Sequence, residues 1–135
     1  MKVKLSEIID AIEMTDQQSK YFLDKKTGEI LCTYEGMMRD EEEEIDQKLD
    51  RHGFYRLPDS FDIRNYDIME SFAEEQSGKA ADTLMRALQG RGAFRRFKDA
   101  VYDLDLDRQW FAFQNEAYRR KAIRWCEEND IKYVE

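Results

Sequence analysis

Positive charges interleaved with phenylalanines form the part of the sequence with the clearest binding chemistry. Six Lys or Arg and one acid lie between Lys79 and Lys98. Guanidinium forks match the geometry of phosphate oxygens, and a run of bases can neutralise a nucleic-acid backbone. Gly90 and Gly92 precede a predicted helix, whose free N–H groups would favour an anion. The candidate residues for binding an anion or a partner are Arg86, Arg91, Arg95, Arg96 and Lys98.

The alternative for this basic segment is a helix surface that binds nothing. Phe94, Phe97 and Val101 recur at helical spacing, which predicts that both phenylalanines belong to the core and are not platforms for base stacking. The cationic side chains would then face water or pair with acids elsewhere in the chain. The sequence leaves open whether residues 79–98 face solvent.

The sequence matches no known catalytic or metal-binding pattern. His52 is the only histidine, and no nucleophile motif accompanies it. The acids at 40–46 point in different directions if they lie on a helix, so they would not converge on a metal. Two carboxylate pairs, Asp59 with Asp62 and Glu74 with Glu75, offer a generic route to a hydrolase. We therefore predict no catalytic residue, no metal and no cofactor, and keep a carboxylate-pair hydrolase as a further alternative.

Length and charge narrow the class of protein. The chain has 135 residues, which favours a single domain over 1–135. Its formal net charge of −8 disfavours non-specific binding to nucleic acid or anionic lipid. Residues 1–75 hold 20 acids and 10 bases, so the acidity lies in the first half. The first residues do not resemble a secretory signal, and Cys32 and Cys126 form no CxxC motif. We expect a cytoplasmic protein with reduced thiols and no membrane association.

The elements that position these residues follow from hydrophobic spacing and turn residues. Apolar spacing predicts a helix over 7–14, with Ser6 as its N-cap, and Gly53 ends a predicted helix over 39–50. A hairpin near 20–34, turning at Gly28, and a strand near 53–57 predict a small antiparallel sheet, with 131–134 as a C-terminal edge strand. Asp62 is the expected cap of the next helix. Beyond Gly78 the pattern is mainly helical, so we predict an α+β fold with about five to six helices.

Several motifs resemble those of a bacterial family known as uncharacterised protein family 0158. The hairpin Phe22-Leu23-Asp24-Lys25-Lys26-Thr27-Gly28-Glu29-Ile30 is similar to the first of them. Tyr55-Arg56-Leu57-Pro58 and Met69-Glu70-Ser71-Phe72 resemble its middle section. The stretch from Gly90 to Asp99, followed by Trp110-Phe111-Ala112-Phe113 and Trp125, is similar to its most distinctive part. The resemblance covers roughly residues 4–131 and implies one domain of bacterial, cytoplasmic type. It implies no particular activity.

These observations favour a binding or regulatory protein over an enzyme. The chain lacks a matched catalytic set and carries halves of different charge. We expect a non-catalytic protein that acts through protein–protein contacts. The alternative is binding to RNA or DNA through the Arg-rich segment 86–98.

Overall fold

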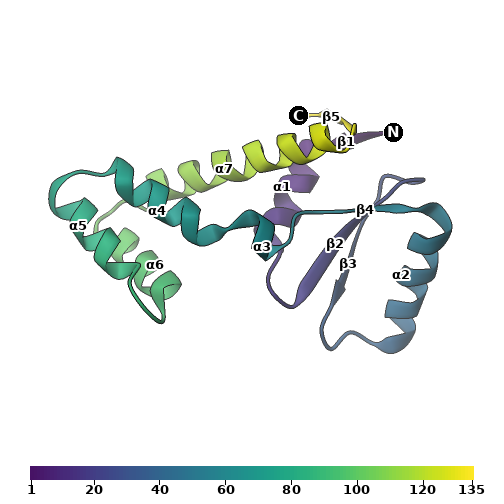
Figure 1. Ribbon diagram of the computed structural model, residues 1–135, viewed down its shortest axis with the longest axis horizontal. Coiled ribbons are helices and arrows are strands. Elements are labelled where there is room, and N and C mark those ends of the chain that lie inside the picture. Colours follow the sequence, from purple (N-terminus) through teal and green to yellow (C-terminus); the bar gives the residue numbers. More distant parts are fainter. The chain divides into compact units, whose positions relative to one another are not determined.

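The computed structural model describes residues 1–135, and it combines short strands with helices that dominate the second half (Figure 1). The predicted α+β class is confirmed. In chain order the elements are β1 Lys2–Lys4, α1 Leu5–Met14, β2 Ser19–Asp24, β3 Ile30–Tyr34, α2 Arg39–His52, β4 Phe54–Arg56, α3 Ser60–Ile63, α4 Asn65–Glu75, α5 Gly78–Ala87, α6 Ala93–Asp103, α7 Asp107–Glu128 and β5 Lys132–Val134.

The chain forms two compact units. Unit 1 comprises Met1–Ile63 and Tyr118–Glu135, and unit 2 comprises Arg64–Ala117. Unit 1 is therefore built from two separate stretches of sequence, while unit 2 is continuous. A single domain over residues 1–135 stays a prediction.

The predicted antiparallel sheet is present in unit 1, with the strand order β3-β2-β4. Phe22 lies opposite Leu31 on one side and opposite Arg56 on the other, so β2 is the central strand. The hairpin turns at Gly28, whose φ of 76° lies in the left-handed region that glycine tolerates best. β2 and α1 both contribute to the core of the unit, where Leu23 and Ile8 are fully buried.

The C-terminal strand is present but belongs to another sheet. β5 pairs in parallel with β1, with Val3 opposite Tyr133, and the two strands form a sheet of their own. The prediction that residues 131–134 form an edge of the hairpin sheet is therefore wrong. β1 was not predicted at all, because three residues between charged neighbours carry no recognisable strand pattern.

Two predicted helix caps differ from the structure. α1 begins at Leu5 with Lys4 at the N-cap position and no capping side chain, so Ser6 is not the cap. Asp62 lies inside α3, where the Asp59 carboxylate accepts its N–H at 2.9 Å, and the Asp62 carboxylate accepts the N–H of Asp59 at 3.2 Å. This reciprocal arrangement is a capping box in which Asp59 is the cap. The predicted end of α2 at Gly53, with φ 76°, is confirmed.

Aromatic rings form the core of unit 2. Phe72 contacts Phe97, Trp110 and Phe113, with ring centroids 5.4 to 6.3 Å apart. Phe97 and Trp110 are buried as predicted. Phe94 is 48% exposed, so its predicted place in the core is wrong. The buried side of α6 centres on Ala93, Phe97 and Val101, and Phe94 falls outside this stripe.

No helix of the structure combines the length and the apolar composition that crossing a membrane requires.

Candidate functional site

The structure places all five predicted binding residues on the surface of unit 2. Arg86 lies in the last turn of α5, Arg91 lies in the connection to α6, and Arg95, Arg96 and Lys98 lie on α6. All five are exposed. Those of the five side chains that form no hydrogen bond within the fold are therefore available to a ligand or a partner.

Arg96 is used inside the fold. Its guanidinium donates hydrogen bonds to three backbone carbonyl oxygens, those of Ala87 at 3.1 Å, Gln89 and Arg91. These carbonyls follow the end of α5, where the helix leaves its last acceptors without partners. The planar fork of Arg96 therefore holds the α5–α6 connection, and we remove it from the set of free binding residues.

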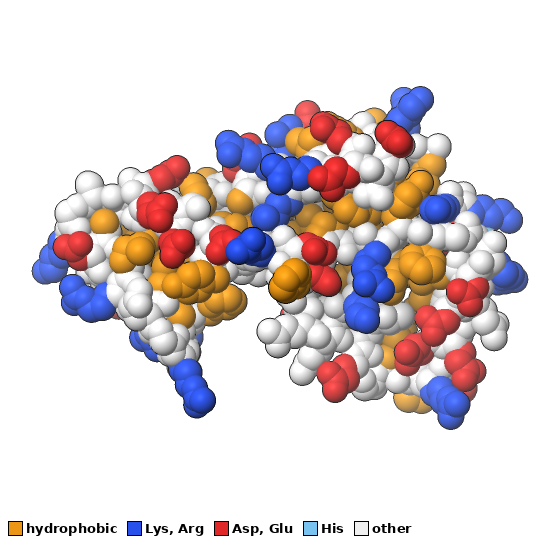
Figure 2. Space-filling view, viewed as in Figure 1, with side chains coloured by type: hydrophobic (Ala, Val, Ile, Leu, Met, Phe, Trp, Pro, Cys, Tyr) orange, Lys and Arg blue, Asp and Glu red, His pale blue; other side chains and the backbone are white.

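Exposed aromatic side chains lie beside the remaining bases. Phe94, Lys98 and Tyr102 are four residues apart, which places them along one side of α6. The ring of Phe111, at the start of α7, packs edge-on against Tyr102 with centroids 6.4 Å apart. Phe94, Tyr102 and Phe111 are 48%, 56% and 50% exposed. We call Phe94, Lys98, Tyr102 and Phe111 the aromatic face. Figure 2 shows hydrophobic side chains on the surface of this unit, with Lys and Arg side chains nearby.

The charges on α6 run against the helix dipole. The bases Arg95 and Lys98 lie in its first half, and the acids Asp99 and Asp103 lie in its second half. Its first turn contains no acid and its last turn contains no base, and no side chain caps its N-terminus at Gly92. A helix is normally stabilised by the opposite arrangement, because its N-terminus carries partial positive charge. The order of charges on α6 is therefore unfavourable for the isolated helix.

The predicted carboxylate pairs are not arranged as a catalytic site. Asp59 and Asp62 accept each other's backbone N–H groups at the start of α3. Glu74 and Glu75 are exposed at the end of α4. No group of three or more His, Cys, Asp or Glu side chains is placed to hold a metal ion.

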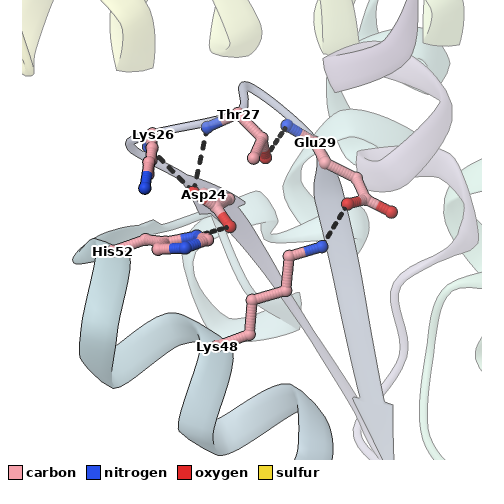
Figure 3. A network of polar contacts seen from close by, with 6 residues as sticks. All are labelled: Asp24, Lys26, Thr27, Glu29, Lys48 and His52. Carbon is pink, nitrogen blue, oxygen red and sulfur yellow. Dashed lines mark hydrogen bonds and ion pairs between the residues drawn. The ribbon is translucent and has the colours of Figure 1, made fainter.

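Unit 1 contains a polar network that the sequence analysis missed (Figure 3). Asp24, at the end of β2, has no solvent exposure. Its Oδ1 accepts the N–H groups of Lys26 at 2.8 Å and Thr27 at 3.1 Å, and its Oδ2 lies 2.7 Å from Nδ1 of His52. The network therefore joins the β2–β3 turn to the C-terminus of α2. An Asp at the start of a turn that ends in Gly28 was the available sequence signal.

Hydrogen bonding outweighs burial at Asp24. Burial disfavours the charged form and by itself would raise the pKa of this carboxyl. The hydrogen bonds from His52 and from the backbone of Thr27 and Lys26 act in the opposite direction, and the pKa falls to about 2. The carboxylate thus stays ionised and fixes the turn. An ion pair between Lys48 and Glu29, at 2.6 Å, adds a second link between α2 and the hairpin.

Such a network also resembles the Asp–His part of a catalytic triad, but the structure shows no nucleophile bonded to it. The Thr27 hydroxyl accepts the N–H of Glu29 at 3.2 Å and so contributes to the turn. His52, the last residue of α2, joins the end of this helix to the turn through its contact with Asp24. We assign the network to the stability of unit 1.

The two thiols have different surroundings. Cys126 is fully buried on α7, and this burial raises the pKa of its thiol to about 11. Cys32, on β3, is half-buried. Neither forms a disulfide.

Comparisons with known proteins agree on one family. The model of the uncharacterised protein family UPF0158 matches residues 1–135. A UPF0158 protein of Pseudomonas aeruginosa is 37% identical over 67 residues, covering 48% of this chain and 44% of the relative. A UPF0158 protein of Chlamydia trachomatis is 23% identical over 141 residues, covering 98% of this chain and 42% of the relative. The chain thus spans less than half the length of these relatives. No solved structure matches. The chain belongs to the uncharacterised protein family UPF0158.

Proposed function

We propose that this protein is a non-catalytic binding protein that engages a protein partner through the aromatic face of unit 2. The observation that carries the proposal is the exposure of Phe94, Tyr102 and Phe111 beside bases that form no ion pair within the unit. Soluble proteins rarely leave neighbouring aromatic rings in water unless the surface binds something. Aromatic residues and arginine are also the types most enriched in the centres of protein interfaces.

The energetics favour a partner with apolar side chains of its own. Each ring keeps about half of its surface in water, so its complete burial would contribute about 1 kcal/mol. Arg91, Arg95 and Lys98 then select among apolar partners, since they attract acidic groups and repel basic ones. The expected partner surface is therefore apolar at its centre and carries acids at its edge.

Nucleic-acid binding is the second candidate, and one observation favours it. Phe94 is exposed next to Arg95 and close to Lys98. Its ring could stack on a nucleobase while Arg95 and Lys98 contact phosphates. Two features weigh against it. Arg96 is held by backbone carbonyls, and Asp99 and Asp103 follow directly on the same helix, where they would repel phosphates.

We further propose that the protein acts in the cytoplasm. Cys32 and Cys126 are both free thiols, which is typical of proteins in reducing compartments.

The test is affinity capture with the full chain, with and without nuclease. Phe94→Ser and Tyr102→Ser should lose the captured protein, whereas Phe61→Ser should retain it, since Phe61 is an 84% exposed aromatic of unit 1. In parallel, a single-stranded uridine oligonucleotide is titrated at several salt concentrations. Tight binding that weakens steeply with salt and is lost in Arg95→Glu would support the second candidate and overturn the first.

A further inference from the structure

We infer that the partner of the aromatic face is a second copy of this chain, bound with the two α6 helices antiparallel across a two-fold axis near Lys98. The inference rests on the proposed function and names its partner. Most homo-oligomers form by such two-fold contacts, in which the same surface of each copy meets the other.

The spacing of the aromatic rings suits this arrangement. Phe94 and Tyr102 each lie four residues from Lys98, on the same side of α6. An antiparallel pair centred at Lys98 therefore sets Phe94 of each copy opposite Tyr102 of the other. The two ring contacts are about 12 Å apart at the rise of an α-helix, with the axis between them. Phe111, which packs against Tyr102, widens the same apolar surface.

The order of charges on α6 suits it equally well. Arg95 lies before Lys98, while Asp99 and Asp103 lie after it, and all three are exposed. In the antiparallel pair the basic half of each helix faces the acidic half of the other, which brings Arg95 close to Asp103 of the second copy. Pairing also removes a disadvantage of the single copy, because acids from the partner approach the N-terminus of each α6. A parallel pair would place bases on bases and acids on acids along the whole helix, whereas the antiparallel pair places only Lys98 beside its own copy, where Asp99 follows in each chain.

A face of four side chains, three of them on α6, is small, so association should depend on concentration. We therefore measure the mass of the full chain by sedimentation velocity and light scattering, from low to high micromolar concentration. The expected result is a shift from the monomer of 16.2 kDa to a dimer. A monomer at every concentration would overturn the inference.

Substitutions test which surface is used. Phe94→Ser and Tyr102→Ser should each weaken dimerisation about thirtyfold, because each substitution removes a ring from both copies. Arg95→Glu should weaken it, and the double variant Arg95→Glu with Asp103→Arg should restore it, because both copies then carry the reversed pair. Arg86→Glu, an exposed base on α5, is the control and should leave the dimer unchanged. The antiparallel pairing is contradicted if the dissociation constant of the dimer is unchanged in the single variants. It is also contradicted if the double variant dimerises as weakly as Arg95→Glu.

A cross-link tests the position of the axis. Lys98→Cys, in a Cys32→Ser background, should form a disulfide-linked dimer on mild oxidation, since residue 98 lies next to its own copy. Asp82→Cys, exposed on α5, should not. Equal cross-linking of both variants contradicts the proposed axis. If the chain stays monomeric but captures a different protein through Phe94 and Tyr102, the partner is not a second copy of this chain. The proposed function then remains supported. Circular dichroism confirms that each variant folds.

Discussion

Replacing Asp24 by Asn should destabilise unit 1 by an amount that depends on pH. The structure gives the carboxyl no solvent exposure, three hydrogen-bond donors and a pKa of about 2, against 3.8 for an unperturbed group. Because each unit of pKa difference corresponds to about 1.4 kcal/mol, the ionised carboxylate stabilises the fold by about 2 kcal/mol at neutral pH. Asn keeps an oxygen for the turn amides but loses the charge.

The sign of the pH dependence follows from the lowered pKa. A carboxyl that is more acidic in the folded state stabilises the protein fully above its unfolded value of 3.8, and this contribution disappears as the pH falls through about 2. The difference between the native protein and Asp24→Asn should therefore be about 2 kcal/mol at pH 6 and should shrink steadily below pH 4.

The assay is urea unfolding at a series of pH values, followed by tryptophan fluorescence, to which Trp125 in the same unit contributes. Asp46→Asn, an exposed acid on α2, is the matched control and should change stability by less than about 0.5 kcal/mol. Equal stability of Asp24→Asn and the native protein at pH 6 would refute the reasoning. A loss that stays constant from pH 6 to pH 2 would show that the charge of the carboxylate plays no part.

Three further predictions concern unit 2 and the thiols. Phe97→Ala should cost about 4 kcal/mol in unfolding free energy by urea titration, whereas Phe94→Ala should cost less than about 1 kcal/mol; similar losses would contradict their different burial. Arg96→Ala should speed hydrogen exchange in the α5–α6 connection, measured by mass spectrometry, because three carbonyls lose their donor. In the native protein, Ellman's reagent should react with Cys32 at pH 8 and spare Cys126, whose burial raises its thiol pKa to about 11; two fast thiols would disprove this.

Local sequence signals predicted the elements of unit 1 that depend on neighbouring residues. The hairpin near Gly28 and the end of α2 at Gly53 follow from turn chemistry, which acts over a few residues. The pairing of β1 with β5 could not be predicted in this way. Each strand has three residues, and the residues they pair lie 130 positions apart, so only the folded core around them selects the partner.

The candidate site shows a similar division. Arg91, Arg95 and Lys98 are exposed, as a charged helix surface should be, and their exposure follows from composition. The exposure of Phe94 could not be predicted from the sequence. A phenylalanine three residues before a buried one fits the edge of the buried side of a helix as well as its surface. The role of Arg96 depends on the path of the α5–α6 connection, which the sequence marks only with Gly90 and Gly92.

The composition of unit 1 from two stretches has a consequence during translation. β5 supplies the partner of β1, and Trp125 donates its indole N–H to the carbonyl of Arg56 at 2.9 Å. These bonds join the first stretch of unit 1 to residues synthesised about 70 or more positions later. Unit 2 is continuous and has all its residues once Ala117 leaves the ribosome. The inserted unit can therefore fold first, while unit 1 has all its residues only after β5 has been synthesised.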